Sequence, residues 1–121
     1  MTTTFRQAEV SADTLESGIL APPSAEPISG DIPVRSKIFF TQDDMGIVSG
    51  IWESDPGSAR WEFTERGEVI HVISGSMTVT EDGASDVTLT AGSTAYFPLG
   101  WKGIWTVHEP LRKVFVVYQR R

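Results

Sequence analysis

The sequence predicts an all-β domain, either a sandwich or a barrel of short strands. The strand-forming residues Val, Ile, Thr, Phe and Trp recur throughout, and 11 Gly and 7 Pro interrupt the chain at short intervals. In several segments apolar and polar residues also alternate with the period of two that is typical of strands. Nine strand signals follow one another, at residues 36–41, 46–53, 59–64, 68–74, 76–80, 86–90, 94–97, 102–107 and 112–119.

Local signals mark where individual strands end. The strand at 46–53 stops at Ser54–Gly57, a Ser-Asp-Pro-Gly sequence typical of turns. The alternation is clearest in 76–80 and 87–90, where the threonines face one way and the apolar residues the other. Between these two strands, Asp82 and Gly83 predict a hairpin, because Asp-Gly readily adopts positive φ.

Residues 1–35 differ from the rest, and we expect them to form an extended N-terminal arm beside a domain that spans residues 36–121. Glu9–Glu16 is compatible with a short helical turn at most. Ala21–Pro27 contains three prolines, which lack the donor that a helix interior needs. The arm is expected to lie on its own or a partner subunit, or to be a loosely ordered tail.

The composition excludes several classes of function. The net charge of −6 and the pI near 4.8 argue against nucleic acid and anionic membranes as partners. Without cysteine, the chain has no disulfides, thiolate chemistry or cysteine-based zinc sites. No apolar run approaches a membrane span, and the first residues lack the apolar core of a secretory signal. We therefore expect a cytoplasmic protein.

Two half-motifs carry the most specific information. Glu68 and Gly75 are separated by six residues, and Gly92 precedes Pro98-x-Gly100 with five residues between. In this order they resemble the cupin motifs G-x5-H-x-H-x3,4-E-x6-G and G-x5-P-x-G-x2-H-x3-N. The resemblance implies a cupin double-stranded β-helix, also called a jelly-roll barrel.

Further matches make the resemblance narrower. The chain is similar to small single-domain cupins related to (S)-ureidoglycine aminohydrolase, a metalloenzyme that releases ammonia from an ureido compound. The segments that carry this similarity, besides the two half-motifs, are Gly50–Glu53, Pro56–Gly57, Lys102–Trp105 and Glu109–Lys113. Such cupins imply a metal-dependent activity on ureido or amide compounds.

The histidines that hold a cupin metal are missing. Counted from Glu68, the first two positions fall at Trp61 and Phe63, or at 62 and 64, and the third falls at Gly103. The chain has only two histidines, His71 and His108, and both have the wrong strand parity to join Glu68. A lone carboxylate does not hold a transition metal, so we expect no metal and no other cofactor.

Glu68 is the strongest candidate for a catalytic residue. By the cupin pattern it faces the barrel interior, where a carboxylate must be paired or protonated. It is then either a general acid or base that also anchors a ligand, or one half of a structural ion pair. The partner would be Lys113 or Arg112. We favour Lys113 as a second candidate catalytic residue, although a rim cation on a solvated face remains an alternative.

Three aromatic residues are candidates for ligand binding. Trp61 and Phe63 stand at lost histidine positions, and Trp105 has the parity of Gly103, which would leave space in the barrel. Together they predict a flat slot for a planar ligand. The alternative is that these rings simply fill the core of a small barrel.

Three classes of function remain open from the sequence. The first is a cupin that binds a small planar or anionic metabolite around Glu68 without a metal. The second is a metal-dependent hydrolase of ureido or amide compounds, and the third is a non-catalytic structural or regulatory module. We also expect a homodimer, because an extended arm and the edge segment 36–41 offer backbone to a neighbour.

Overall fold

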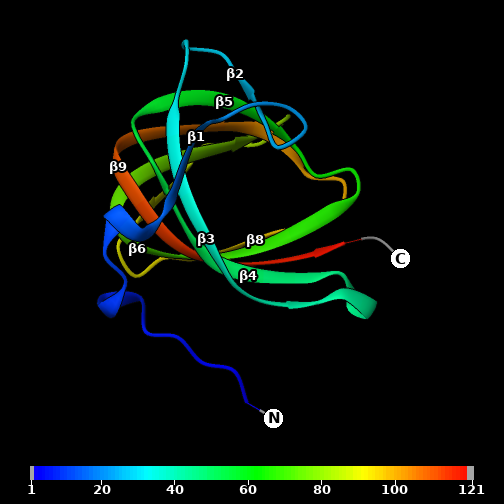
Figure 1. Cartoon of the computed structure of the whole chain (residues 1–121). Coiled ribbons are helices and arrows are strands. Elements are labelled where there is room, and N and C mark those ends of the chain that lie inside the picture. The colour runs from blue at the N-terminus through cyan, green and yellow to red at the C-terminus, as the bar shows by residue number, and fades with distance from the viewer. Residues whose placement is uncertain (1, 120–121) are drawn as a thin grey trace.

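The computed structural model describes residues 2–119 as a single curved sheet with no α-helix, which confirms the predicted all-β fold. The described residues include three short 3₁₀ turns and nine strands, joined by loops (Figure 1). The elements in order are η1 (Gln7–Glu9), η2 (Ala12–Thr14), β1 (Glu16–Ile19), β2 (Glu26–Pro27), β3 (Pro33–Gln42), η3 (Asp43–Met45), β4 (Ile47–Ser54), β5 (Gly57–Glu62), β6 (Arg66–Glu81), β7 (Val87–Thr90), β8 (Thr94–Phe97) and β9 (Lys102–Gln119).

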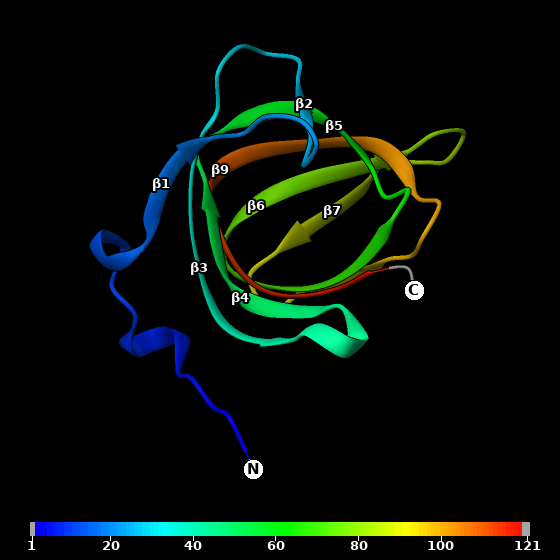
Figure 2. The same ribbon diagram turned by 45° about the vertical axis from the view of Figure 1, so that its right-hand side comes forward.

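Two long strands, β6 and β9, hold the two faces of the barrel together. The first half of β6 pairs with β8 and with the second half of β9, which also pairs with β4. The second half of β6 pairs with β7 and with the first half of β9, which also pairs with β5. Figures 1 and 2 show these strands curving around a common interior.

The bend in both long strands is centred on Gly75. The register between β6 and β9 shifts three times between Val72 and Met77. Gly75 has φ of +88°, and a Cβ there would lie 2.1 Å from the backbone oxygen of Pro110 on β9. The predicted strand pairs 68–74 with 76–80, and 102–107 with 112–119, are therefore continuous strands bent at a bulge, and not separate strands joined by turns.

The predicted hairpin at Asp82–Gly83 is present. Gly83 has φ of +79°, the backbone N–H of Ala84 donates to the carbonyl of Glu81, and β6 pairs antiparallel with β7. Across this pair, Met77 and Leu89 are buried on the inner face. The alternation seen in the sequence therefore places these apolar residues in the core.

The segment expected to be an extended arm is paired with the sheet along part of its length. β1 lies antiparallel to β3, and β2 lies antiparallel to β5 (Figure 2). Nearer the N-terminus, the guanidinium of Arg112 on β9 donates to the backbone oxygens of Gln7 and Val10, at 2.9 and 2.6 Å. The same guanidinium is paired with Glu53 at 2.6 Å. The arm segment 7–27 is thus fastened to the barrel at three places.

Aromatic rings fill one end of the interior. Trp61 stacks on Trp105 with ring centroids 4.0 Å apart, and Phe63 stacks on Phe97 at 5.6 Å. Trp101 meets Phe97 edge to face at 5.0 Å. These rings belong to one buried cluster with the aliphatic residues of β6.

Within residues 2–119 no helix is long and apolar enough to cross a membrane.

The bulge at Gly75 predicts a specific sensitivity to a methyl group. Gly75→Ala should destabilise the protein by about 3 kcal/mol, because left-handed backbone costs ~1–2 kcal/mol with a side chain and overpacking adds a similar amount. Gly83→Ala is the matched control, since its φ is also positive but a Cβ there meets nothing within 4 Å. Urea unfolding measures both. Equal losses of free energy of unfolding would contradict the packing argument.

Candidate functional site

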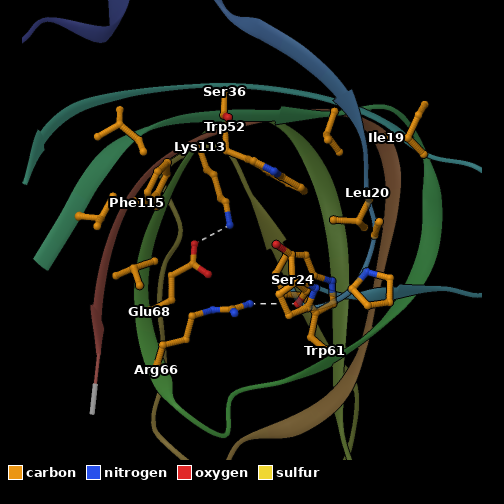
Figure 3. A pocket seen from close by; sticks show the side chains of 17 residues that line it. Ile19, Leu20, Ser24, Ser36, Trp52, Trp61, Arg66, Glu68, Lys113 and Phe115 are labelled. Atoms are coloured by element: carbon orange, nitrogen blue, oxygen red, sulfur yellow. Dashed lines mark hydrogen bonds and ion pairs between the residues drawn. The ribbon is translucent and has the colours of Figure 1, made fainter. Parts of the chain in front are cut away.

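A pocket of about 460 Å³ opens beside the packed aromatic rings, and Trp61 belongs to both. Its walls come from the inner faces of β3, β4, β5, β6 and β9, and from residues 19–24 of the N-terminal segment (Figure 3). Most of the lining is apolar, and it includes Trp52, Trp61 and Phe115. Three charged side chains interrupt it: Glu68 and Arg66 from β6, and Lys113 from β9. This mixture of apolar walls and few polar groups is typical of small-molecule sites.

Glu68 and Lys113 form a buried ion pair across the pocket wall. Lys113 Nζ donates to Glu68 Oε2 at 2.7 Å, and the two side chains are 2% and 5% exposed. Strand alternation positions both: Glu68 lies on the face of β6 that buries Ile70 and Val72, and Lys113 lies on the face of β9 that buries Leu111. The sequence left open whether Lys113 or Arg112 faces inward; Lys113 does.

Aromatic rings surround the ammonium group of Lys113. Its Nζ lies 4.5 Å from the ring centroid of Trp52, 4.6 Å from that of Trp105 and 5.7 Å from that of Trp61. Burial lowers the pKa of Lys113 below its usual value, although the charge of Glu68 and its hydrogen bond act in the opposite direction. The cation is therefore held by the carboxylate and by ring faces, without access to bulk water.

One oxygen of Glu68 is available to interact with a bound molecule. Among residues 2–119, Oε2 accepts from Lys113, and Oε1 accepts no hydrogen bond from a side chain or a backbone amide. Because Glu68 lines the pocket, Oε1 can accept an N–H or O–H from a bound molecule. The neighbouring ammonium can supply a proton through Oε2 and the carboxylate can accept one, so general acid or base chemistry is also within reach.

Arg66 lies at the rim of the same pocket. Its Nη2 donates to the backbone oxygen of Ser24 at 3.0 Å, and its guanidinium lies 5.2 Å from the ring centroid of Phe63. The bond to Ser24 ties the loop after β1 to β6 and completes the wall on that side (Figure 3). Neither Arg66 nor this loop was predicted as part of the site.

The aromatic residues proposed from the sequence lie in two different places. Trp61 lines the pocket, whereas Phe63 and Trp105 pack in the aromatic core and are 0% and 1% exposed. The vacancy expected at Gly103 is absent, and that expectation was wrong. A Cβ at Gly103 would lie 2.3 Å from the backbone oxygen of Thr80 and 2.7 Å from the ring of Trp101, so the indole occupies the space.

Trp52 is the aromatic residue that the sequence-based site omitted. Its ring stands edge to face with Trp61 at 6.1 Å and covers Lys113. Its segment, Gly50–Glu53, had already been noted as part of the cupin resemblance. Pairing of Trp52 with Lys113 across β4 and β9 would have placed it in the site, but that register is not visible in the sequence.

Both histidines lie outside the barrel, as their parity predicted. His71 Nδ1 is 2.8 Å from Thr94 Oγ1, and His108 Nε2 is 2.7 Å from Thr78 Oγ1, all on the exposed surface. In the described part of the chain, no group of three or more His, Cys, Asp or Glu side chains could hold a metal ion. The donor set around Glu68 therefore does not fit a transition metal.

Comparison with known families agrees with the fold and with the two half-motifs. The model of the EutQ-like cupin domain matches residues 41–115, more than half of the chain. The chain belongs to the EutQ-like cupin family. A search of curated proteins found no match. The matched range of this EutQ-like cupin includes Glu68 and Lys113, but the family description names no activity.

Solved structures similar to this EutQ-like cupin share its fold. The EutQ protein of Clostridium difficile is 24% identical, with a TM-score of 0.62 over 74% of this chain and 64% of that one. A protein of unknown function from Pseudomonas syringae pv. tomato is 23% identical, with a TM-score of 0.75 over 85% and 43% of the two chains. A putative ethanolamine utilization protein Q from Salmonella typhimurium is 17% identical, with a TM-score of 0.62 over 82% and 97%. The chain thus spans less than two thirds of the first two.

The lowered pKa of Lys113 predicts a pH dependence of stability. Below the pKa that Lys113 has in the folded protein, its side chain is charged in both the folded and the unfolded state, so burial opposes folding in full. Between that pKa and 10.5, the unfolded chain binds more protons than the folded protein. The free energy of unfolding of the wild type should therefore rise with pH just below 10.5, relative to Lys113→Met. Urea unfolding at several alkaline pH values measures the difference. A difference that falls with pH would mean that Glu68 outweighs burial.

Proposed function

We propose that this cupin binds a small organic metabolite at the barrel mouth, without a metal, and that Glu68 is its polar anchor. One observation carries the proposal: the buried carboxylate is neutralised by Lys113 through one oxygen and keeps the other free in an open pocket. Trp52 and Trp61 supply flat apolar walls for the rest of the molecule. A pocket of about 460 Å³ suits a ligand of metabolite size.

The other two classes of function receive less support. A metal-dependent hydrolase needs three more ligands than Glu68, and the cupin histidine positions hold Trp61, Phe63 and Gly103. A purely structural module would have a filled interior, whereas only one end of this barrel is packed with rings. The similarity to ureidoglycine aminohydrolase-like cupins suggests a ligand that is rich in N–H groups, from which Glu68 Oε1 could accept a hydrogen bond.

If binding is the function, Glu68 and Lys113 also become the candidates for proton transfer. Lys113 is buried among rings and bonded to a single carboxylate, so a proton can move between the two groups without water. Such a pair is suited to general acid or base work on a ligand that is bonded to Oε1. Binding alone needs only the charge and shape of Glu68.

Removing the charge of Glu68 should weaken binding. Ligands found by screening metabolites for tryptophan fluorescence changes should bind Glu68→Gln at least tenfold more weakly, since a charge-assisted hydrogen bond contributes roughly 1.5–3 kcal/mol. The matched control is Glu81→Gln, the same change at the exposed last residue of β6. Titration calorimetry compares the three proteins. Unchanged affinity of Glu68→Gln would assign Glu68 a structural role only.

Purified protein should contain substoichiometric zinc, iron, nickel and manganese after dialysis against a chelator. The reason is the donor set: a lone carboxylate paired with an ammonium does not hold such ions. Elemental analysis by mass spectrometry measures the metal content. One equivalent of any of these metals per chain would instead favour the metal-dependent hydrolase.

A further inference from the structure

The charges that line the pocket do not balance within the protein. Three of the described lining residues are charged: Glu68 and Lys113 neutralise one another at 2.7 Å, and Arg66 remains. Arg66 is also unlike the other arginines among residues 2–119. Each of the others forms an ion pair with a carboxylate, at 2.6–3.8 Å, whereas the described partners of Arg66 are a backbone oxygen and a ring.

We infer that Arg66 is the anchor for a carboxylate of the ligand, so that the pocket takes small organic acids. This inference rests on the proposed function and names its ligand class. A guanidinium has five N–H donors in a planar fork, and Arg66 uses one of them on Ser24. The others can hold a carboxylate through two parallel hydrogen bonds, the geometry that arginine favours.

Charge counting selects a carboxylate over a phosphate. The lining carries one net positive charge, from Arg66, Lys113 and Glu68 together. A monoanion brings the site to neutrality. A dianionic phosphate would leave one uncompensated negative charge near the carboxylate of Glu68, which is itself only 5% exposed, and like charges repel at such a site.

The position of Glu68 adds a second requirement on the ligand. Arg66 and Glu68 are two residues apart on β6 and both line the pocket, so one small molecule can reach both. Glu68 Oε1 needs a donor, and the indoles of Trp52 and Trp61 need a flat or apolar part. The class is therefore a small carboxylic acid that carries a separate O–H or N–H donor.

The N-terminal segment takes part in this site. Ser24 accepts the only described hydrogen bond of the Arg66 guanidinium, and residues 19–24 wall the pocket above it. A carboxylate bound to the remaining donors would therefore lie against this loop. The ligand and the loop then share one guanidinium. This arrangement places the carboxylate of the ligand at the rim and the rest of the ligand toward Glu68.

Matched acids and amides test the inference. The probes are acetate and acetamide, benzoate and benzamide, and 4-hydroxybenzoate and 4-hydroxybenzamide, titrated into the full chain with tryptophan fluorescence and calorimetry as readouts. We expect wild type to bind 4-hydroxybenzoate at least tenfold more tightly than its amide. Arg66→Gln should remove this preference, and Arg66→Lys should keep only part of it. Arg6→Gln, the same charge change at an exposed arginine, should leave it intact.

The outcomes separate the inference from the proposed function. Equal binding of acid and amide by wild type, or a preference that survives in folded Arg66→Gln, overturns the role of Arg66 while the pocket remains a binding site. A loss of acid and amide affinity by the same factor in Arg66→Gln means that Arg66 only holds the loop, and also overturns the inference. No binding of any probe counts against the pocket as a ligand site. Circular dichroism melting confirms that each variant is folded.

Discussion

The ion pair between Glu68 and Lys113 is the interaction on which the candidate site depends. It joins β6 to β9, the two strands that run through both faces of the barrel, at a depth where both side chains are almost fully buried. Moving an ion out of water costs several kcal/mol even in real proteins, so neither residue could occupy this position alone. The rings of Trp52 and Trp105 compensate part of the cost for Lys113.

The architecture separates a rigid end from an open one. Stacked rings of Phe63, Phe97, Trp101 and Trp105 fill one end and leave no room for a ligand. Beside these rings the barrel stays open, and residues 19–24 of the N-terminal segment close one side of the mouth. Under the proposed function, this polar pair between a packed core and a pocket is kept for binding, because apolar residues of the same size would pack there at lower cost.

The sequence predicted the fold and the inward position of Glu68, but it did not predict features that depend on strand register. Glycine and proline spacing identified the barrel, and alternation placed Glu68 inside because β6 keeps its period from Glu68 to Val72. The period then reverses across the bulge at Gly75, so β6 could not be recognised as one strand. Lys113 follows from Trp105 by unbroken parity along β9, although Arg112 looked equally suitable by hydrophobicity.

Other parts of the site could not be predicted, because they depend on contacts between segments far apart in the chain. Ser24 meets Arg66 across 42 residues, and nothing in either local sequence indicates it. Gly103 looked like empty space because its own side chain is absent, while the ring of Trp101, two residues earlier, turns back into that space. Side-chain volume that comes from a neighbour in space is invisible to reasoning along a strand.

The most direct test of the central claim is the stability of Glu68→Met/Lys113→Met, measured by urea unfolding. Both replacements approximate the lost volumes, remove the buried charges together and leave no unpaired ion. If the pair is kept for a ligand, the double variant should be as stable as the wild type or more stable, by up to about 4 kcal/mol. A loss of several kcal/mol in the double variant would show that the pair is kept for the fold, and would contradict this account.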